Sequence, residues 1–237
     1  MPRFCIINGD DFGASAGVNR GIVEAHCEGV LTSASLMVNR PGAAEAARLS
    51  RDLPQMSVGL HCALTAEDST ALVDFDSPRD CRTEIAAQWV RFVDLVGSAP
   101  THLDCHHNVH RDPRLTPVLL EWAHRHGVPL REHSPVRYFS SFYGQWDGET
   151  HLEQIGVDML CRMLQAEIGE GVTELSCHPG YVDADFVSDY SIEREAELRT
   201  LCDPVVRAVI EEQQIELISY RDLHRVSAER GEAVEAT

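Results

Sequence analysis

Short apolar runs alternate with longer amphipathic stretches along the whole chain. The short runs, apolar or rich in β-branched residues, predict strands, and the stretches between them repeat apolar residues at helical spacing. We expect strands at 4–8, 31–38, 57–61, 102–105, 128–131, 173–177 and 215–219. We expect helices at 16–28, 43–50, 82–96, 115–126, 152–168 and 193–212, the last interrupted at Pro204.

This alternation predicts an α/β fold with a parallel sheet. Seven strand signals indicate a barrel-like arrangement with one irregular unit, although an open doubly wound sheet has the same local pattern. A length of 237 residues fits one domain. We place that domain at residues 1–225 and expect residues 226–237, rich in Ser, Glu, Gly and Ala, to be a frayed tail.

Two stretches, 63–80 and 132–150, lack periodicity and are rich in polar residues, glycine and aromatic residues. Each follows a predicted strand, so both lie at the carboxyl-end face, where active sites of parallel α/β proteins form. The second stretch contains an aromatic cluster that suits stacking on a sugar ring, and it equally suits a small hydrophobic core. The cluster consists of Tyr138, Phe139, Phe142, Tyr143 and Trp146.

The formal net charge is −18, which argues against a nucleic acid or an anionic membrane surface as the main partner. A neutral or cationic small substrate fits better, and acidity also favours solubility. The first residues do not resemble a signal peptide, and no apolar run approaches a membrane span. We therefore expect a cytoplasmic protein. Its 8 cysteines form no CxxC pair, which predicts reduced thiols rather than a zinc ribbon.

Histidine and aspartate concentrate where the predicted strands end. The first strand runs into Asp10 and Asp11, and the third ends at His61. Side chains from several strand ends converge at one edge of a parallel sheet, as a divalent metal site requires. A metal that neutralised one of the two aspartates would leave the other as a general base. The residues Asp10 to Gly13 also favour a turn, which is the alternative for the two aspartates. The alternative for His61 is a structural role, which is more common for a lone histidine.

The segment 102–110 contains four histidines and an aspartate in nine residues. Strand alternation places His102, Asp104, His106 and Asn108 on one face. His106, nearest the strand end, is the best candidate ligand, and Asp104 could accept the other N–H of a ligand histidine. Solvent-exposed histidines are the alternative, which this density makes the weaker one.

Further candidates follow the fifth and sixth strands. Pro179 and Gly180 form a rigid turn that could hold His178 towards the site, where a protonated imidazole would serve as a general acid. A turn that merely contains a histidine is the alternative. Arg131 could pair with a carboxylate, hydrogen-bond a sugar or form a structural ion pair.

Taken together, these segments resemble the YdjC-like family of carbohydrate deacetylases, including its chitooligosaccharide and hopanoid-associated members. The resemblance rests on five ordered motifs, at 8–13, 32–39, 59–61, 101–107 and 177–181, and continues through 194–198 and 215–223. It implies an irregular TIM-like (β/α) barrel that holds one divalent ion, commonly magnesium or zinc. It also implies a homodimer.

The resemblance further implies roles for individual residues. The metal ligands would be Asp11, His61 and His106, with Asp10 as the base and His178 as the acid. Substrate or supporting contacts would come from Asp104, Arg131, Asn108, His110 and Tyr181. The chain departs from the family at Gly9, Cys105 and Asn108, and its 62–83 segment is shorter than in chitooligosaccharide members, which indicates a different acceptor.

The expected reaction is hydrolysis of an N-acetyl group on an amino sugar, oligosaccharide or glycoconjugate. The metal would polarise the carbonyl and activate water, while the base and the acid move the protons. A metal-dependent phosphoesterase is one alternative, although such sites need more carboxylates than these strand ends supply. A sugar-binding module without catalysis is the other.

Overall fold

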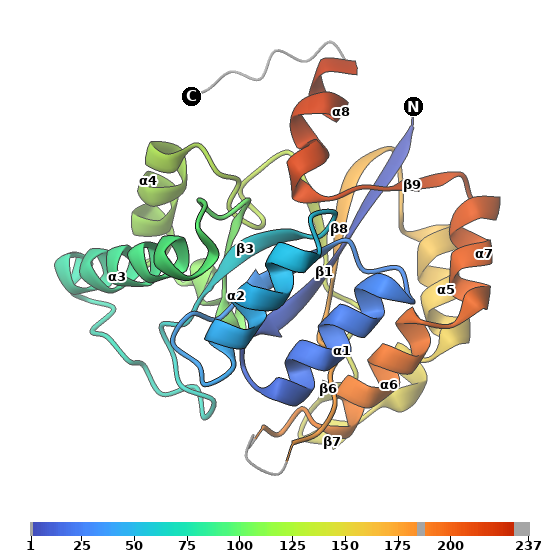
Figure 1. The fold of residues 1–237 in the computed structure, drawn as a ribbon, viewed down its shortest axis with the longest axis horizontal. Helices are drawn as coiled ribbons and strands as arrows, with labels where there is room; N and C mark the ends of the chain where they lie inside the picture. The colour runs from blue at the N-terminus through green and yellow to red at the C-terminus, as the bar shows by residue number, and fades with distance from the viewer. Residues whose placement is uncertain (1, 184–187, 230–237) are drawn as a thin grey trace.

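The structure, a computed structural model, describes residues 2–183 and 188–229. Figure 1 shows a central sheet surrounded by helices. Seven strands form it in the order β4-β3-β2-β1-β8-β5, with β9 paired to β1 beside that path, and the pairings are parallel. This confirms the predicted α/β class and the seven-stranded parallel sheet. The strands are β1 (Arg3–Phe12), β2 (Ser33–Leu36), β3 (Ser57–Cys62), β4 (Leu103–Cys105), β5 (Arg137–Phe139), β8 (Gly171–Cys177) and β9 (Ile215–Leu217).

The helices follow the strands much as the periodicity predicts. The α-helices are α1 (Ala16–Cys27), α2 (Ala43–Asp52), α3 (Pro78–Val96), α4 (Thr116–His126), α5 (Val157–Ala166), α6 (Ile192–Leu201), α7 (Pro204–Glu212) and α8 (Leu223–Glu229). Three short 3₁₀ segments are η1 (His106–Arg111), η2 (Leu152–Ile155) and η3 (Tyr220–Asp222). Helix α3 begins four residues earlier than predicted because Ser77 caps it and Pro78 occupies its first position.

Strand β1 is the centre of the sheet. One edge of β1 pairs with β8 from Arg3 to Gly9. Its other edge pairs first with β9, over Arg3 to Cys5, and then with β2, from Asn8 onward. The sheet order ends at β4 and β5, so the curled sheet is an open barrel between these two strands.

Two local predictions differ from the structure. Residues 128–131 do not form a strand and contribute only a parallel bridge between Leu130 and Leu103. The segment ends at Glu132, whose φ of 63° turns the chain, and the strand beside β8 is instead β5, within the stretch expected to be irregular. The small hairpin β6 (Gln145–Trp146) and β7 (Glu149–Thr150) lies in the same stretch.

The alternation of side chains in β1 divides the core. Cys5 and Ile7 belong to the large apolar cluster shared with the helices, whereas Phe4 and Ile6 belong to a smaller cluster. Asn8 and Asp10 continue the Phe4–Ile6 face towards the carboxyl end of the strand. The apolar interior therefore becomes polar at that end of the barrel.

All eight cysteines are free, and four of them are buried in strands. No helix in the described part of the chain is both long and apolar enough to cross a membrane. Of the tail expected at residues 226–237, residues 226–229 lie in α8 and the others lie outside the described residues.

Candidate metal centre and active site

A bulge at the end of β1 brings Asp10 and Asp11 into one cavity. In a regular strand, adjacent side chains point to opposite faces, so the two carboxylates would diverge. The pairing of β1 with β2 shifts register between Gly9 and Phe12, and Asp11 adopts a left-handed φ of 67°. This irregularity changes the direction of the Asp11 side chain. As a result, the carboxylates of Asp10 and Asp11 line the same cavity.

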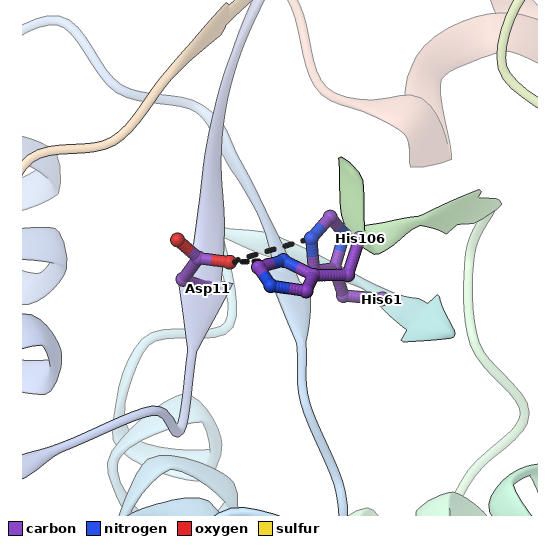
Figure 2. Close-up of side chains that lie close together, drawn as sticks. All are labelled: Asp11, His61 and His106. Carbon is purple, nitrogen blue, oxygen red and sulfur yellow. Dashed lines mark ion pairs between the residues drawn. The ribbon is translucent and has the colours of Figure 1, made fainter. Parts of the chain in front are cut away.

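Two histidines from neighbouring strands face Asp11. His61 lies near the end of β3, and His106 directly follows β4. Nε2 of His61 is 3.4 Å and Nδ1 of His106 is 3.2 Å from Oδ1 of Asp11. Figure 2 draws both contacts as dashed lines. All three side chains are buried, and their possible ligand atoms lie within 4.8 Å of one another. The structure thus brings together the three predicted ligands.

These three residues fit a divalent cation. Oδ1 of Asp11 is buried and has no hydrogen-bond partner among the described residues, so its lone pairs are available to a cation. One carboxylate oxygen and two imidazole nitrogens are common ligands of divalent metals in proteins. The cluster could therefore hold one ion at the carboxyl edge of the sheet.

Neighbouring charged groups orient this cluster. Nδ1 of His61 lies 2.8 Å from Oδ1 of Asp104, which leaves Nε2 directed towards Asp11. Arg194 donates to the other oxygen of Asp11 at 2.6 Å. Burial alone would raise the pKa of Asp11, but Arg194 and then the two imidazoles hold it well below its usual value. Asp11 is therefore a carboxylate at neutral pH, as a metal ligand must be.

Arg131 is the centre of a buried ion network behind the cavity. Its guanidinium donates to both oxygens of Asp10 at 2.8 Å. It also contacts Asp104 at 2.8 Å and Glu174 at 2.7 Å. Arg131 is 2% exposed and does not line the cavity, so of the roles considered from the sequence the structure favours the ion pair over a sugar contact.

We expect Arg131→Ala to lower the free energy of unfolding by about 3–5 kcal/mol, because it leaves buried carboxylates without their cation. Urea denaturation of the mutant and the wild type measures this change. Arg82→Ala is the control, since Arg82 pairs with Glu121 at an exposed site, where a pair contributes about 0–1 kcal/mol. Equal unfolding free energies for the two mutants would contradict the role given to Arg131.

His178 lines the same cavity as the metal cluster and lies in the turn after β8. Its Nε2 is 3.9 Å from Oδ2 of Asp10. Burial lowers the pKa of His178 to about 4, although Asp10 and Asp11 oppose the shift. The sequence predicts a protonated imidazole, whereas this environment keeps the imidazole neutral at pH 7 until a proton reaches it.

The turn that carries His178 is hydrogen-bonded to the buried carboxylate of Glu197, which also binds Tyr190. The backbone N–H of His178 and the hydroxyl of Tyr190 both donate to Glu197. Burial raises the pKa of Glu197 to about 8, although both of these donors favour its charged form. Tyr190 also accepts from the N–H of Gly144 at 2.9 Å and stacks on Tyr143. These contacts connect the turn after β8 to the stretch 132–150, which contains the aromatic cluster.

The cavity has a volume of about 530 Å³ and opens at the carboxyl ends of the strands. Asn108 lines it, as do Tyr138 and Tyr143 from the aromatic stretch. Among the described residues, its wall also includes Asp10, Asp11, His61, Glu67, His106, His107, Gln145, His178, Asp189, Tyr190 and Arg194.

Of the five predicted contact residues, only Asn108 lines this cavity in the described part of the chain. His110 is fully buried, and its Nε2 lies 2.8 Å from Glu132. The hydroxyl of Tyr181 donates to Glu24 at 2.6 Å, and Tyr181 lines a separate groove along α1. Asp104 does not line the cavity either, and it contacts the cavity residue His61 and the buried Arg131.

Sequence reasoning did not assign roles to four residues that surround the centre. They are Glu67, Tyr190, Arg194 and Glu197. A signal existed for two of them, because Arg194 and Glu197 are charged residues three positions apart in a predicted helix. Such residues share a helix face, and both are buried in α6.

The fold and the site define a class of protein: a parallel α/β barrel, open on one side, that gathers an Asp-His-His cluster at the carboxyl ends of its strands. Within this class the sequence identifies the family. The model of the family described as YdjC-like protein matches residues 5–212, and the chain belongs to this family.

Individual relatives cover nearly the whole chain. It is 39% identical to a carbohydrate deacetylase of Geobacillus stearothermophilus, over 95% of this chain and 100% of the relative. It is 34% identical to a chitooligosaccharide deacetylase of Salmonella typhimurium, over 94% and 100%. The crystal structure of an Enterococcus faecalis protein assigned to cellobiose-phosphate cleavage aligns with a TM-score of 0.77 at 28% identity, over 94% and 99% of the two chains.

Proposed function

We propose that this protein is a metal-dependent carbohydrate deacetylase, which hydrolyses the N-acetyl group of an amino sugar to acetate and a free amine. One observation carries the proposal. The buried cluster of Asp11, His61 and His106 opens into a cavity that also contains a second carboxylate, Asp10, and a second imidazole, His178. The deacetylase names of the full-length relatives support the same activity.

Asp11, His61 and His106 would hold the divalent ion. When bound, the ion would act as a Lewis acid on the amide carbonyl and make water more acidic. We propose zinc or magnesium as the ion, and the two imidazole donors favour zinc.

Asp10 is the proposed general base. The Arg131 guanidinium holds both of its oxygens, and Asn8 donates to Oδ1 at 2.8 Å, so the carboxylate is fixed beside the metal cluster. A fixed carboxylate at the cavity wall can take the proton from an attacking water molecule.

His178 is the proposed proton donor to the departing amine. The 3.9 Å between its Nε2 and Asp10 gives a proton taken up by Asp10 a short path to the imidazole. Because burial lowers the pKa of His178 to about 4, the imidazolium formed in this way is a stronger acid than an ordinary imidazolium. One proton thus leaves water and one reaches the amine, which balances the hydrolysis.

The ion pairs around the cavity argue against a phosphoesterase with several metal ions. Of the carboxylates that line it, Asp10, Asp11 and Glu67 are each paired with an arginine. A second candidate cluster, formed by Asp10, His61 and Asp104, includes two carboxylates that already contact Arg131. A guanidinium at that position disfavours a second metal ion, so the site suits one cation.

Acetate release from a panel of compounds tests the proposal. N-acetylglucosamine, chitobiose, longer N-acetylated oligosaccharides and glycoconjugates are incubated with the protein and added Mg²⁺, Zn²⁺, Mn²⁺ or Co²⁺. We expect equal amounts of acetate and free amine from at least one compound, and loss of both on chelation. Phosphate release from a phosphorylated sugar without acetate release, or sugar binding without turnover, would overturn the proposal. The homodimer and the cytoplasmic location stay predictions.

A further inference from the structure

The two ring nitrogens of His106 face two different carboxylates. Its Nδ1 faces Asp11 at 3.2 Å. If Nδ1 offers its lone pair to a cation, the proton of the neutral ring must reside on Nε2. Nε2 is buried and has no hydrogen-bond partner among the described residues, and an acidic side chain, Glu67, lies 3.6 Å from it.

In the same centre, both ring nitrogens of His61 face a carboxylate at close distance. Its Nδ1 lies 2.8 Å from Asp104, and its Nε2 faces Asp11. Carboxylates that accept the second N–H of ligand histidines fix their tautomer and ring orientation. The carboxylate of Glu67 stands in the corresponding position beside His106, at a longer distance.

Glu67 lies in a tight turn that brings it over the cavity. Thr65 and Ala71 form an antiparallel bridge, and the N–H of Ala66 donates to the carbonyl of Thr70 at 2.8 Å. Arg40, from the segment before α2, forms an ion pair with the Glu67 carboxylate. The turn and the ion pair together hold a partly buried carboxylate at the cavity wall.

We propose that Glu67 is a positioning residue that accepts the Nε2–H of His106 and so aims Nδ1 at the bound cation. The inference rests on the proposed metal centre. An approach of less than about 1 Å from the present 3.6 Å brings the two atoms into hydrogen-bonding range. Asp104 would then orient His61, and Glu67 would orient His106.

Metal binding without substrate tests this inference. Zn²⁺ is titrated into the full chain in the presence of a competing chelator, and the dissociation constant is compared among wild type, Glu67→Ala, Glu67→Gln and Asp68→Asn. We expect Glu67→Ala to weaken Zn²⁺ binding by about 10- to 100-fold. Glu67→Gln should retain most of the affinity, because its amide oxygen still accepts the N–H.

Asp68→Asn is the matched control, since it removes one negative charge from the same turn. Asp68 is exposed, and its contact with the N–H of Thr70 can be kept by asparagine. We expect wild-type affinity for this variant. The visible absorption spectrum of bound Co²⁺ should change in Glu67→Ala but not in Asp68→Asn.

The outcomes separate the inference from the function on which it rests. Equal affinities of wild type and Glu67→Ala would overturn the role of Glu67 and leave the metal centre intact. Equal losses in Glu67→Gln and Glu67→Ala, or in Asp68→Asn and Glu67→Ala, would mean that charge alone matters, and would also overturn it. A wild-type chain that binds no Zn²⁺ or Co²⁺ would overturn the metal centre itself.

Discussion

Asp10→Asn is expected to lower kcat for acetate release by about 10²- to 10⁴-fold, the contribution typical of general acid–base catalysis. Asparagine has nearly the same shape and can still contact Arg131, but it cannot take a proton from water. The three proposed metal ligands are unchanged, so the variant should still bind a cation. Steady-state kinetics and a Zn²⁺ titration measure the two properties separately.

Glu174→Gln is the matched control for this variant. Glu174 also contacts Arg131, at 2.7 Å, but it does not line the cavity. Both substitutions therefore neutralise a carboxylate of the same ion network, and only one of them removes the proposed base. Near wild-type turnover in Asp10→Asn, or equal losses in the two variants, would show that Asp10 is not the base.

His61→Ala and His106→Ala are expected to remove the bound ion and, with it, the deacetylase activity. Each substitution takes away one of the three donors that the described residues place in the cluster. Elemental analysis after dialysis should find one ion per chain in the wild type and almost none in either variant. Acetate release should fall in parallel.

The control for the histidine variants is His124→Ala, on the exposed surface of α4. It removes an imidazole without touching the cavity, so its metal content and activity should match the wild type. A full ion in His61→Ala or His106→Ala would mean that the cation binds elsewhere.

The sequence predicted the sheet and the two histidines of the cluster because both depend on local patterns. The choice of Asp11 over Asp10 as a ligand came from the family resemblance. Apolar runs located six of the seven strands of the main sheet, and histidines at strand ends indicated which side chains could converge. The strand expected at 128–131 was wrong because Glu132 turns the chain after Arg131. The short β5 was missed because its sequence contains no apolar run that would predict a strand.

Other features of the site depend on contacts that residue patterns do not contain. Strand alternation would have separated Asp10 from Asp11, and only the bulge in β1 places both in the cavity. The contacts of Arg194 with Asp11 and of Arg131 with Asp10 join residues 183 and 121 positions apart. Such pairings follow from the completed fold, so periodicity and spacing could not predict them.

The position of β1 has a consequence for how the protein is made. Its partners β8 and β9 lie near the other end of the chain, at 171–177 and 215–217. During synthesis, β2 can pair with the end of β1 early, but the parts of β1 that pair with β8 and β9 stay unpaired until most of the polypeptide has left the ribosome. Parallel pairings over such long separations form slowly and are exposed to aggregation. Nascent chains that stop before β8 should therefore need chaperones, even though Asp11, His61 and His106 have all been synthesised by then.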